Sequence, residues 1–196
     1  MGGRGAWSAT ASRESERLSR SAGGSGRPSE KLPSSMFQHL EGNRTSTTAT
    51  ARAVEENITQ NSFETGVIID SEGFVVAAYK GDSHSVGFSD GRGNDDYSKL
   101  AGSVMTHNHP SGSAAFSDAD IMLASYYGVR EIRAATRNNG TAVLTADNHH
   151  ADWRALNRAY QRDYATSAMP TVRSAQQWMF DNASNYGFTF VIDRRQ

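Results

Sequence analysis

The chain has 196 residues, 37% of them hydrophobic, and a formal net charge of −1, with 20 lysine and arginine residues against 21 aspartate and glutamate residues. This balance argues against a dedicated nucleic-acid-binding protein, which needs clustered basic side chains to neutralise phosphates. Cysteine is absent, so disulfides and cysteine-ligated zinc are excluded. Since no apolar leader and no stretch of membrane-spanning length occurs, we expect a protein of a bacterial or phage-infected cytoplasm without membrane contact.

The first 50 residues differ in composition from the rest of the chain. They are rich in Gly, Ser, Thr, Arg and Ala, with too few large apolar side chains to offset the entropy lost on ordering. We therefore predict a flexible arm over residues 1–50 and one domain over residues 51–196. Composition favours a solvated linker over an arm that contacts nucleic acid or a partner, and residues 36–40 form a candidate docking element within it.

The remaining elements alternate between helix and strand patterns. Residues 50–58 have helical periodicity, which would leave Glu55 and Glu56 in solvent. Residues 64–70 and 74–78 predict two strands joined by a turn, and residues 131–136 and 141–145 predict a second hairpin around Asn139 and Gly140. Helices are expected over residues 151–164 and from Pro170 to residue 180, followed by a strand at 188–192. The pattern indicates a mixed α/β fold.

Two histidines stand two positions apart in the segment that follows residue 103. In an extended strand, alternate side chains point the same way, so His107 and His109 can reach one metal ion. Pro110 favours an extended conformation at His109. Asn108 points away from the pair and is equally suited to supporting the metal ligands or to bonding the neighbouring loop.

A helix start follows the histidines. Ser117 is a plausible N-cap, and Asp120 lies in the first turn, where the helix dipole favours negative charge. Two histidines and one aspartate match the usual ligand number of a catalytic zinc site. Capping alone would account for Ser117, although the same hydroxyl can also serve a catalytic role.

The complete string, His-x-His-Pro-x6-Ser-x-x-Asp from His107 to Asp120, resembles the signature of the JAMM (also called MPN or JAB) metallopeptidases at every specified position. The resemblance implies Zn²⁺ held by His107, His109 and Asp120, and an α+β fold similar to cytidine deaminases, with a central, mostly antiparallel mixed sheet and flanking helices. It also implies a glutamate general base. Glu64, just before the first predicted strand, matches the RadC-type branch of this family.

That family chemistry would hydrolyse a peptide or isopeptide bond through a zinc-activated water. Glu64 would move the proton and Ser117 would stabilise the oxyanion. The expected partner is a protein or peptide substrate, such as a ubiquitin-like or phage protein, since residues 81–105 also resemble JAMM-like domains of phage and prophage proteins.

The alternative is a noncatalytic module of a phage or prophage system in which zinc braces the fold. A fourth protein ligand, such as His84, His149 or His150, would favour it. A solvated position is nevertheless the simplest expectation for these three histidines and for His39. A role in DNA transactions is suggested only by the RadC-type resemblance, and the charge balance gives it little support.

Overall fold

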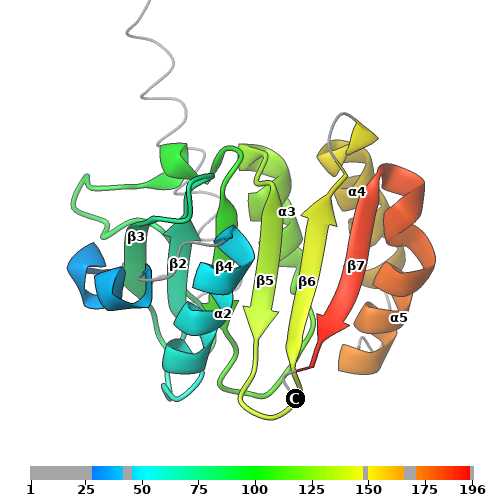
Figure 1. Ribbon diagram of the computed structural model, residues 1–196. Coiled ribbons are helices and arrows are strands. Elements are labelled where there is room, and N and C mark those ends of the chain that lie inside the picture. Colours follow the sequence, from blue (N-terminus) through cyan, green and yellow to red (C-terminus); the bar gives the residue numbers. More distant parts are fainter. Residues whose placement is uncertain (1–27, 42–45, 148–149, 166–170, 195–196) are drawn as a thin grey trace, which may run out of the picture.

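Within the part of the chain that the structure describes, seven strands form one mixed sheet in the order β1-β3-β2-β4-β5-β6-β7 (Figure 1). The structure is a computed structural model, and it describes residues 28–41, 46–147, 150–165 and 171–194. Only the β4/β5 pair is parallel, and the other neighbours are antiparallel. The expected central, mostly antiparallel sheet is confirmed. The strands are β1 (Glu30–Leu32), β2 (Thr65–Ile69), β3 (Val75–Lys80), β4 (Val104–Asn108), β5 (Glu131–Ala135), β6 (Thr141–Ala146) and β7 (Phe188–Asp193).

Helices cover both faces of this sheet. Helix α2 lies on one face, and α3 and α4 lie on the other, with α5 beside β7 (Figure 1). The helices are α2 (Thr47–Ile58), α3 (Asp118–Tyr127), α4 (Trp153–Tyr160) and α5 (Val172–Asn182). Short helical segments complete the described chain: η1 (Ser34–Glu41), η2 (Tyr97–Leu100), η4 (Gln161–Ala165) and η5 (Ala183–Tyr186). In the described ranges, no helix combines the length and apolar character needed to cross a membrane.

Two predicted hairpins are confirmed. In the β2–β3 turn, the Asp70 carboxylate accepts hydrogen bonds from the backbone of Glu72 and Phe74 at 3.0 and 2.9 Å. The β5–β6 turn ends at Gly140, whose φ of 82° lies in the left-handed region that favours glycine. Both turns leave the following strand antiparallel to the preceding one.

Alternate side chains along the strands pack into two separate hydrophobic cores, one on each face of the sheet. The core under α2 and η1 includes Val67, Ile69 and Val104, whereas the core on the opposite face includes Ile68 and Met105. This alternation follows from the two-residue period of a strand. Consecutive residues of β4 therefore face opposite layers of the molecule, which decides where its polar residues lie.

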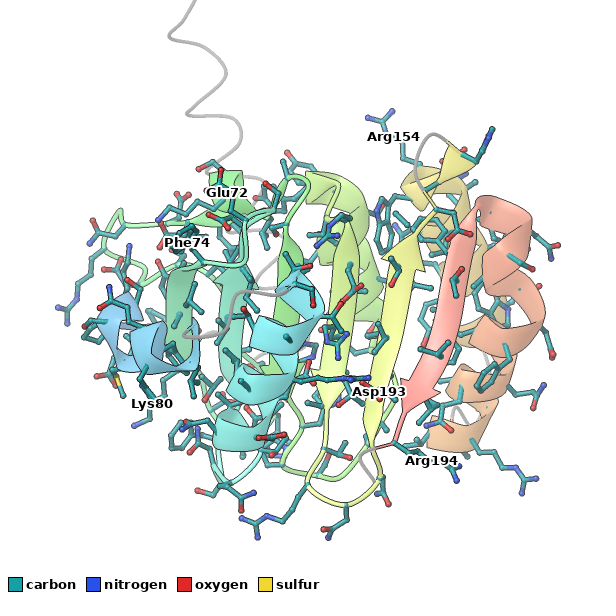
Figure 2. The ribbon with its side chains drawn as sticks, viewed as in Figure 1. Glu72, Phe74, Lys80, Arg154, Asp193 and Arg194 are labelled. Carbon is teal, nitrogen blue, oxygen red and sulfur yellow. The ribbon has the colours of Figure 1, made fainter. Side chains whose placement is uncertain are left out.

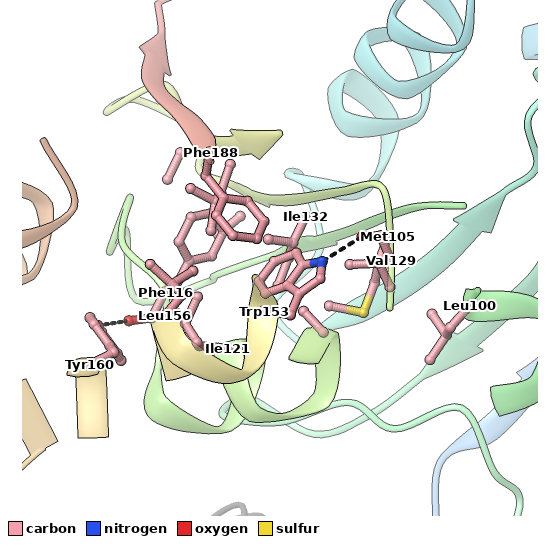
Figure 3. Close-up of a cluster of buried hydrophobic side chains, with 14 of the residues drawn as sticks. Leu100, Met105, Phe116, Ile121, Val129, Ile132, Trp153, Leu156, Tyr160 and Phe188 are labelled. Carbon is pink, nitrogen blue, oxygen red and sulfur yellow. Dashed lines mark hydrogen bonds between the residues drawn. The ribbon is translucent and has the colours of Figure 1, made fainter. Parts of the chain in front are cut away.

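The larger core also buries aromatic side chains whose polar atoms are satisfied (Figure 3). Trp153 donates from Nε1 to the carbonyl of Val129 at 2.8 Å, and the Tyr160 hydroxyl donates to the carbonyl of Phe116 at 2.8 Å. The second bond ties α4 to the segment that leads into α3. Packing behind the sheet thus fixes the start of α3.

The flexible arm predicted over residues 1–50 is wrong for residues 28–41 and 46–50. Strand β1 pairs with β3 at the sheet edge, and Phe37, in the candidate docking element, is 4% exposed in the α2-side core. Residues 47–50 begin α2, with Ser46 as its N-cap. The pairing of β1 with β3 and the burial of Phe37 attach this polar segment to the domain. Residues 1–27 and 42–45 lie outside the described residues.

Candidate metal centre

His107 and His109 meet at the carboxyl end of β4. His107 is the fourth residue of the strand and His109 follows its end, still extended enough for its backbone N–H to donate to the carbonyl of Ala135 at 2.8 Å. Their Nε2 atoms lie 2.8 Å apart, and their ring centroids are 4.6 Å apart. The predicted convergence of the two imidazoles is confirmed. The pair faces α3 and not α2.

Asp120 brings a carboxylate to the same point from the first turn of α3. Its Oδ1 lies 3.3 Å from Nε2 of His107, and its Oδ2 lies 3.9 Å from Nε2 of His109. Two ligand atoms bound tetrahedrally to one zinc ion are separated by about 3.3 Å, given metal–ligand distances of about 2.0–2.1 Å. The observed separations of 2.8, 3.3 and 3.9 Å lie within about 0.6 Å of that value. All three ligand atoms lie within 4.8 Å of one another, so the residues fit a metal ion.

Hydrogen bonds behind the rings fix their orientation. Nδ1 of His109 lies 2.7 Å from the carbonyl oxygen of Ser113, so the hydrogen on this ring sits on Nδ1 and Nε2 is left as a lone-pair donor. His107 is bonded to the backbone of Arg133 in the adjacent strand β5. Such outer contacts are typical of metal-binding histidines because they hold the required tautomer.

Ser117 positions the aspartate. Its hydroxyl donates to Oδ2 of Asp120 at 2.7 Å and its backbone N–H donates to the same oxygen at 2.8 Å. The hydroxyl oxygen also accepts the backbone N–H of Asp120 at 3.1 Å, which closes a capping box at the start of α3. The capping role is confirmed, and Oδ1 is left facing His107. The oxyanion role of Ser117 remains a prediction.

Glu64 lies beside the ligand triangle and not in it. Its Oε1 is 4.0 Å from Nε2 of His109, and the residue is 7% exposed. Burial raises the pKa of the Glu64 carboxyl from 4.5 to about 7, opposed in part by the positive charge of His107. A carboxyl group that titrates near neutrality can both accept and return a proton. The position suits a group that contacts a water bound at the centre.

The charges of the centre are strongly coupled. Burial alone would lower the pKa of His107, but the carboxylates of Asp120 and Glu64 raise it to about 9. The pKa of Asp120 moves the other way: despite burial, the positive charge and hydrogen bond of His107 hold it well below its usual range. Burial and the neighbouring His107 lower the pKa of His109. The shifts of His107 and Asp120 share one cause, the attraction between the His107 ring and the Asp120 carboxylate.

Asn108 connects β4 to the segment that carries Glu64. Its Oδ1 accepts the backbone N–H of Thr65 at 2.7 Å, and its Nδ2 donates to the carbonyl of Phe63 at 3.0 Å. The residue is 1% exposed. Of the two roles that the sequence allowed, bonding of a neighbouring loop is the one that these contacts show. The bonded backbone groups flank Glu64 on both sides.

Of the other histidines, the three that the structure describes do not join the cluster. His84 is exposed, with Nδ1 2.7 Å from the Ser83 hydroxyl, and His39 and His150 are exposed as well. His149 lies outside the described residues. In the described part of the chain, the group able to hold a metal comprises His107, His109 and Asp120. Three protein ligands is the usual number for a catalytic zinc site.

A buried ion-pair network behind the centre was missed by the sequence analysis. The prediction that Glu55 is solvated is wrong: the residue is fully buried, and its Oε1 accepts from Nε of Arg133 at 2.5 Å. Thr106, next to His107 but facing α2, donates to the same carboxylate at 3.0 Å. Glu131 binds the other side of the guanidinium at 2.9 Å. Helical periodicity placed Glu55 on α2 correctly, but gave no sign of the arginine that it meets. Glu56 is exposed, as expected.

In comparisons with known proteins, the chain matches no family model, no curated protein and no solved structure. The spacing of its residues and the geometry of the metal centre are therefore the grounds on which a function can be inferred.

Proposed function

We propose that this chain is a zinc-dependent metallopeptidase of the JAMM type that hydrolyses a peptide or isopeptide bond in a protein or peptide substrate. One observation carries the proposal: His107, His109 and Asp120 converge within 4.8 Å, and the Glu64 carboxylate lies 4.0 Å from the nearest ligand nitrogen. Three ligands with an adjacent carboxylate form the minimal arrangement for metal-assisted hydrolysis.

The donor set supports zinc as the metal. Imidazole nitrogens and a carboxylate oxygen are ligand types that zinc prefers, and the inter-ligand distances of 2.8, 3.3 and 3.9 Å lie on either side of the tetrahedral value of about 3.3 Å. When bound, zinc lowers the pKa of a coordinated water to about 7 and polarises a carbonyl group. His107, His109 and Asp120 hold the ion, and their outer hydrogen bonds keep the donor atoms pointing inward.

Glu64 is the proton carrier in this proposal. In the metal-free chain, burial raises the pKa of Glu64 to about 7. A bound zinc ion would lower this pKa, so Glu64 would be a carboxylate able to take a proton from water and deliver it to the leaving amine. Burial, the largest cause of the raised pKa, also keeps bulk water from competing for the proton. Its backbone N–H and carbonyl bond to Asp82 and Gly81 at 2.6 and 2.8 Å, which extends the β2–β3 ladder and fixes its approach to the centre.

Ser117 has a positioning role that is compatible with a catalytic one. The hydroxyl donates its proton to Asp120 at 2.7 Å. To stabilise an oxyanion, the Ser117 hydroxyl would have to turn its proton toward the substrate. The bond from the Ser117 backbone N–H, at 2.8 Å, would then hold Asp120 alone.

The substrate we propose is a protein, with ubiquitin-like and phage proteins as the candidates. We place the reaction in the cytoplasm of a bacterial or phage-infected cell.

Metal content is the first test. The purified full chain, loaded with zinc and passed through a desalting column, should retain one zinc ion per chain by mass spectrometry, and the His109→Ala variant should retain none. Thr145→Ala, a change at a half-buried residue of β6, serves as the matched control and should retain zinc. Absence of zinc from the wild-type chain contradicts the proposal.

Cleavage is the second test. A peptide library made from a bacterial proteome should gain new amino termini with the wild-type chain. These should fall by roughly 10²- to 10⁴-fold with Glu64→Gln at unchanged zinc content, because only the proton carrier is removed. If zinc binds but neither the library nor a peptide conjugate joined through a lysine isopeptide bond is cut, or if Glu64→Gln cuts equally well, the centre is a structural brace and the peptidase proposal fails.

A further inference from the structure

A groove of about 760 Å³ lies next to the metal centre. Its walls are residues 112 and 114, the β5–β6 turn at residues 136–140, the start of α5, and the end of β7. A volume of this size lies within the range of about 300–1,000 Å³ that is common for binding sites. The groove therefore has room for several side chains of a bound ligand.

The groove and the metal centre share one wall. Ser113 accepts from His109 on the metal side, while its neighbours Gly112 and Ala114 line the groove. The amide of Asn139 donates to the carbonyl of Gly112 at 2.8 Å, and the amide of Gln176 donates to the carbonyl of Ala114 at 2.5 Å. Residues 112–114 are thus fixed by His109 on one side and by Asn139 and Gln176 on the other. A polypeptide bound in the groove would contact the segment that His109 also contacts.

The groove carries positive charge. Arg137, Arg173 and Arg194 line it, and none of the described lining residues is acidic. Arg194 lies near the start of α5, whereas the carboxylate of the preceding residue, Asp193, is turned to α2, where it binds Arg52 at 2.9 Å (Figure 2). The charge of these arginines is therefore not neutralised from within the lining. It contrasts with the net charge of −1 of the whole chain.

We propose that this groove binds an acidic stretch of the substrate polypeptide, next to the bond that is cut. The inference rests on the proposed peptidase function and adds a substrate class to it. Arginines at the rim would pair with the carboxylates of glutamate or aspartate side chains. Two features favour a peptide as the occupant: the segment of residues 112–114 that lines the groove also contacts His109 through Ser113, and the side-chain amide of Asn138 on the groove wall can bond a peptide backbone.

Binding of defined peptides tests the proposal. The probe is a fluorescein-labelled peptide of alternating glutamate and alanine, compared by anisotropy with the same peptide carrying glutamine, on the full zinc-loaded chain. Replacing Arg173 and Arg194 together by glutamine should weaken binding of the glutamate peptide roughly fivefold, since exposed charge pairs each contribute modestly. The loss should shrink at high salt. Arg154→Gln, on the opposite edge of the molecule in Figure 2, is the matched control and should bind as the wild type does.

Several outcomes overturn the proposal. The groove has no preference for acidic chains if both peptides bind equally, or if Arg154→Gln weakens binding as much as the double change. A single-stranded oligonucleotide that binds more tightly and depends on the same arginines would assign the groove to nucleic acid instead. Zinc content and library cleavage are measured on the same samples, so loss of zinc or of cleavage in the wild type, with peptide binding intact, marks failure of the peptidase function and not of the groove.

Discussion

Asn108 bonds the backbone immediately before and after Glu64, at the carbonyl of Phe63 and the N–H of Thr65. Asn108, which stands between the two histidines of the candidate metal centre, thereby fixes the segment that carries the proposed proton carrier. Because side chains alternate along β4, Asn108 can do this while the two histidines face the candidate metal centre. The spacing of the ligands and the position of Glu64 are therefore set by one strand.

Replacing Asn108 by alanine should impair catalysis more than metal binding. The change removes both bonds and leaves a buried N–H and carbonyl unpaired, which should lower the free energy of unfolding by about 1–3 kcal/mol. Library cleavage should fall at least tenfold at unchanged zinc content, because a carrier displaced by about 1 Å loses its geometry. Zinc content by mass spectrometry, urea unfolding and cleavage rates measure the three quantities.

A second variant at residue 108 tests whether Asn108 positions Glu64 or only stabilises the fold. Asn108→Asp keeps the acceptor for Thr65, but it replaces the donor to Phe63 with an oxygen and adds a negative charge at a site that is 1% exposed. Its cleavage rate should be lower than that of the wild type. A cleavage rate equal to that of the wild type in both variants would show that Asn108 stabilises the loop without positioning Glu64.

Glu55 offers a second prediction, on the opposite face of β4. Alanine at this position leaves the Arg133 guanidinium, whose side chain is 2% exposed, without its closest carboxylate. Breaking a buried pair in this way costs about 3–5 kcal/mol, reduced here because Glu131 remains bound. Thermal and urea unfolding should show a loss of about 3 kcal/mol. Glu56→Ala, an exposed neighbour on the same helix, should change stability by less than about 0.5 kcal/mol; equal losses in both variants would refute a role for the ion pair.

The two acidic neighbours also show what the sequence could and could not predict. The cluster of His107, His109 and Asp120 was predictable only in part from local effects: strand alternation orients the two histidines and a helix cap places Asp120. That the strand and the helix meet was implied by the resemblance to the JAMM signature. The β2–β3 hairpin followed from apolar runs around a turn in the same way. The environment of Glu55 was not predictable, since its partner Arg133 lies 78 residues away and nothing local distinguishes Glu55 from Glu56.

The amino-terminal segment illustrates a different limit. Composition predicts disorder by averaging over many residues. Strand β1 forms because it pairs with strand β3 at the edge of the sheet, where Glu30 lies opposite Lys80. This partner is too distant in the sequence for a local pattern to indicate it. The buried ring of Phe37 adds apolar contacts, but one such residue hardly changes the average composition of the segment. Short segments held by long-range pairing therefore escape sequence rules of this kind.

Asp96 provides a test of how this segment is held. Its carboxylate, whose side chain is 6% exposed, binds Lys31 of β1 at 2.7 Å and Lys99 at 2.8 Å, and accepts the Tyr79 hydroxyl at 2.8 Å. Asp96→Asn should lower the free energy of unfolding by about 1–2 kcal/mol at neutral pH, after allowance for the solvent exposure of both lysines. Asp95→Asn, its exposed neighbour, is the control and should have little effect.

The same variant predicts a pH dependence. Burial would raise the pKa of Asp96, but its bonds to Lys31, Lys99 and Tyr79 outweigh burial and lower it below 3.8. A lowered pKa in the folded state means that the contribution is present above pH 3.8 and is lost as the pH falls through the folded value. The stability difference between wild type and Asp96→Asn should therefore shrink in acid unfolding experiments. A difference that stays constant down to pH 2 would show that charge is not involved.

Zinc binding should depend on pH through His107. In the metal-free chain, its pKa is raised from 6.5 to about 9, so its protonation stabilises the fold fully below pH 6.5, and this contribution is lost as the pH rises through 9. Zinc requires the unprotonated ring, and binding must displace that proton. The stabilisation by added zinc should therefore grow between pH 6.5 and 9, by at most about 1.4 kcal/mol per pH unit.

Two measurements check this expectation. Melting temperatures with and without zinc should diverge as the pH rises across that range. Calorimetric titration in two buffers of different ionisation enthalpy should show proton release on zinc binding at pH 7.5. His107→Ala should abolish both effects because it removes the ligand and the proton together, whereas His84→Ala, an exposed histidine outside the centre, should leave them unchanged. Zinc binding without proton release would mean that His107 is already neutral in the metal-free chain.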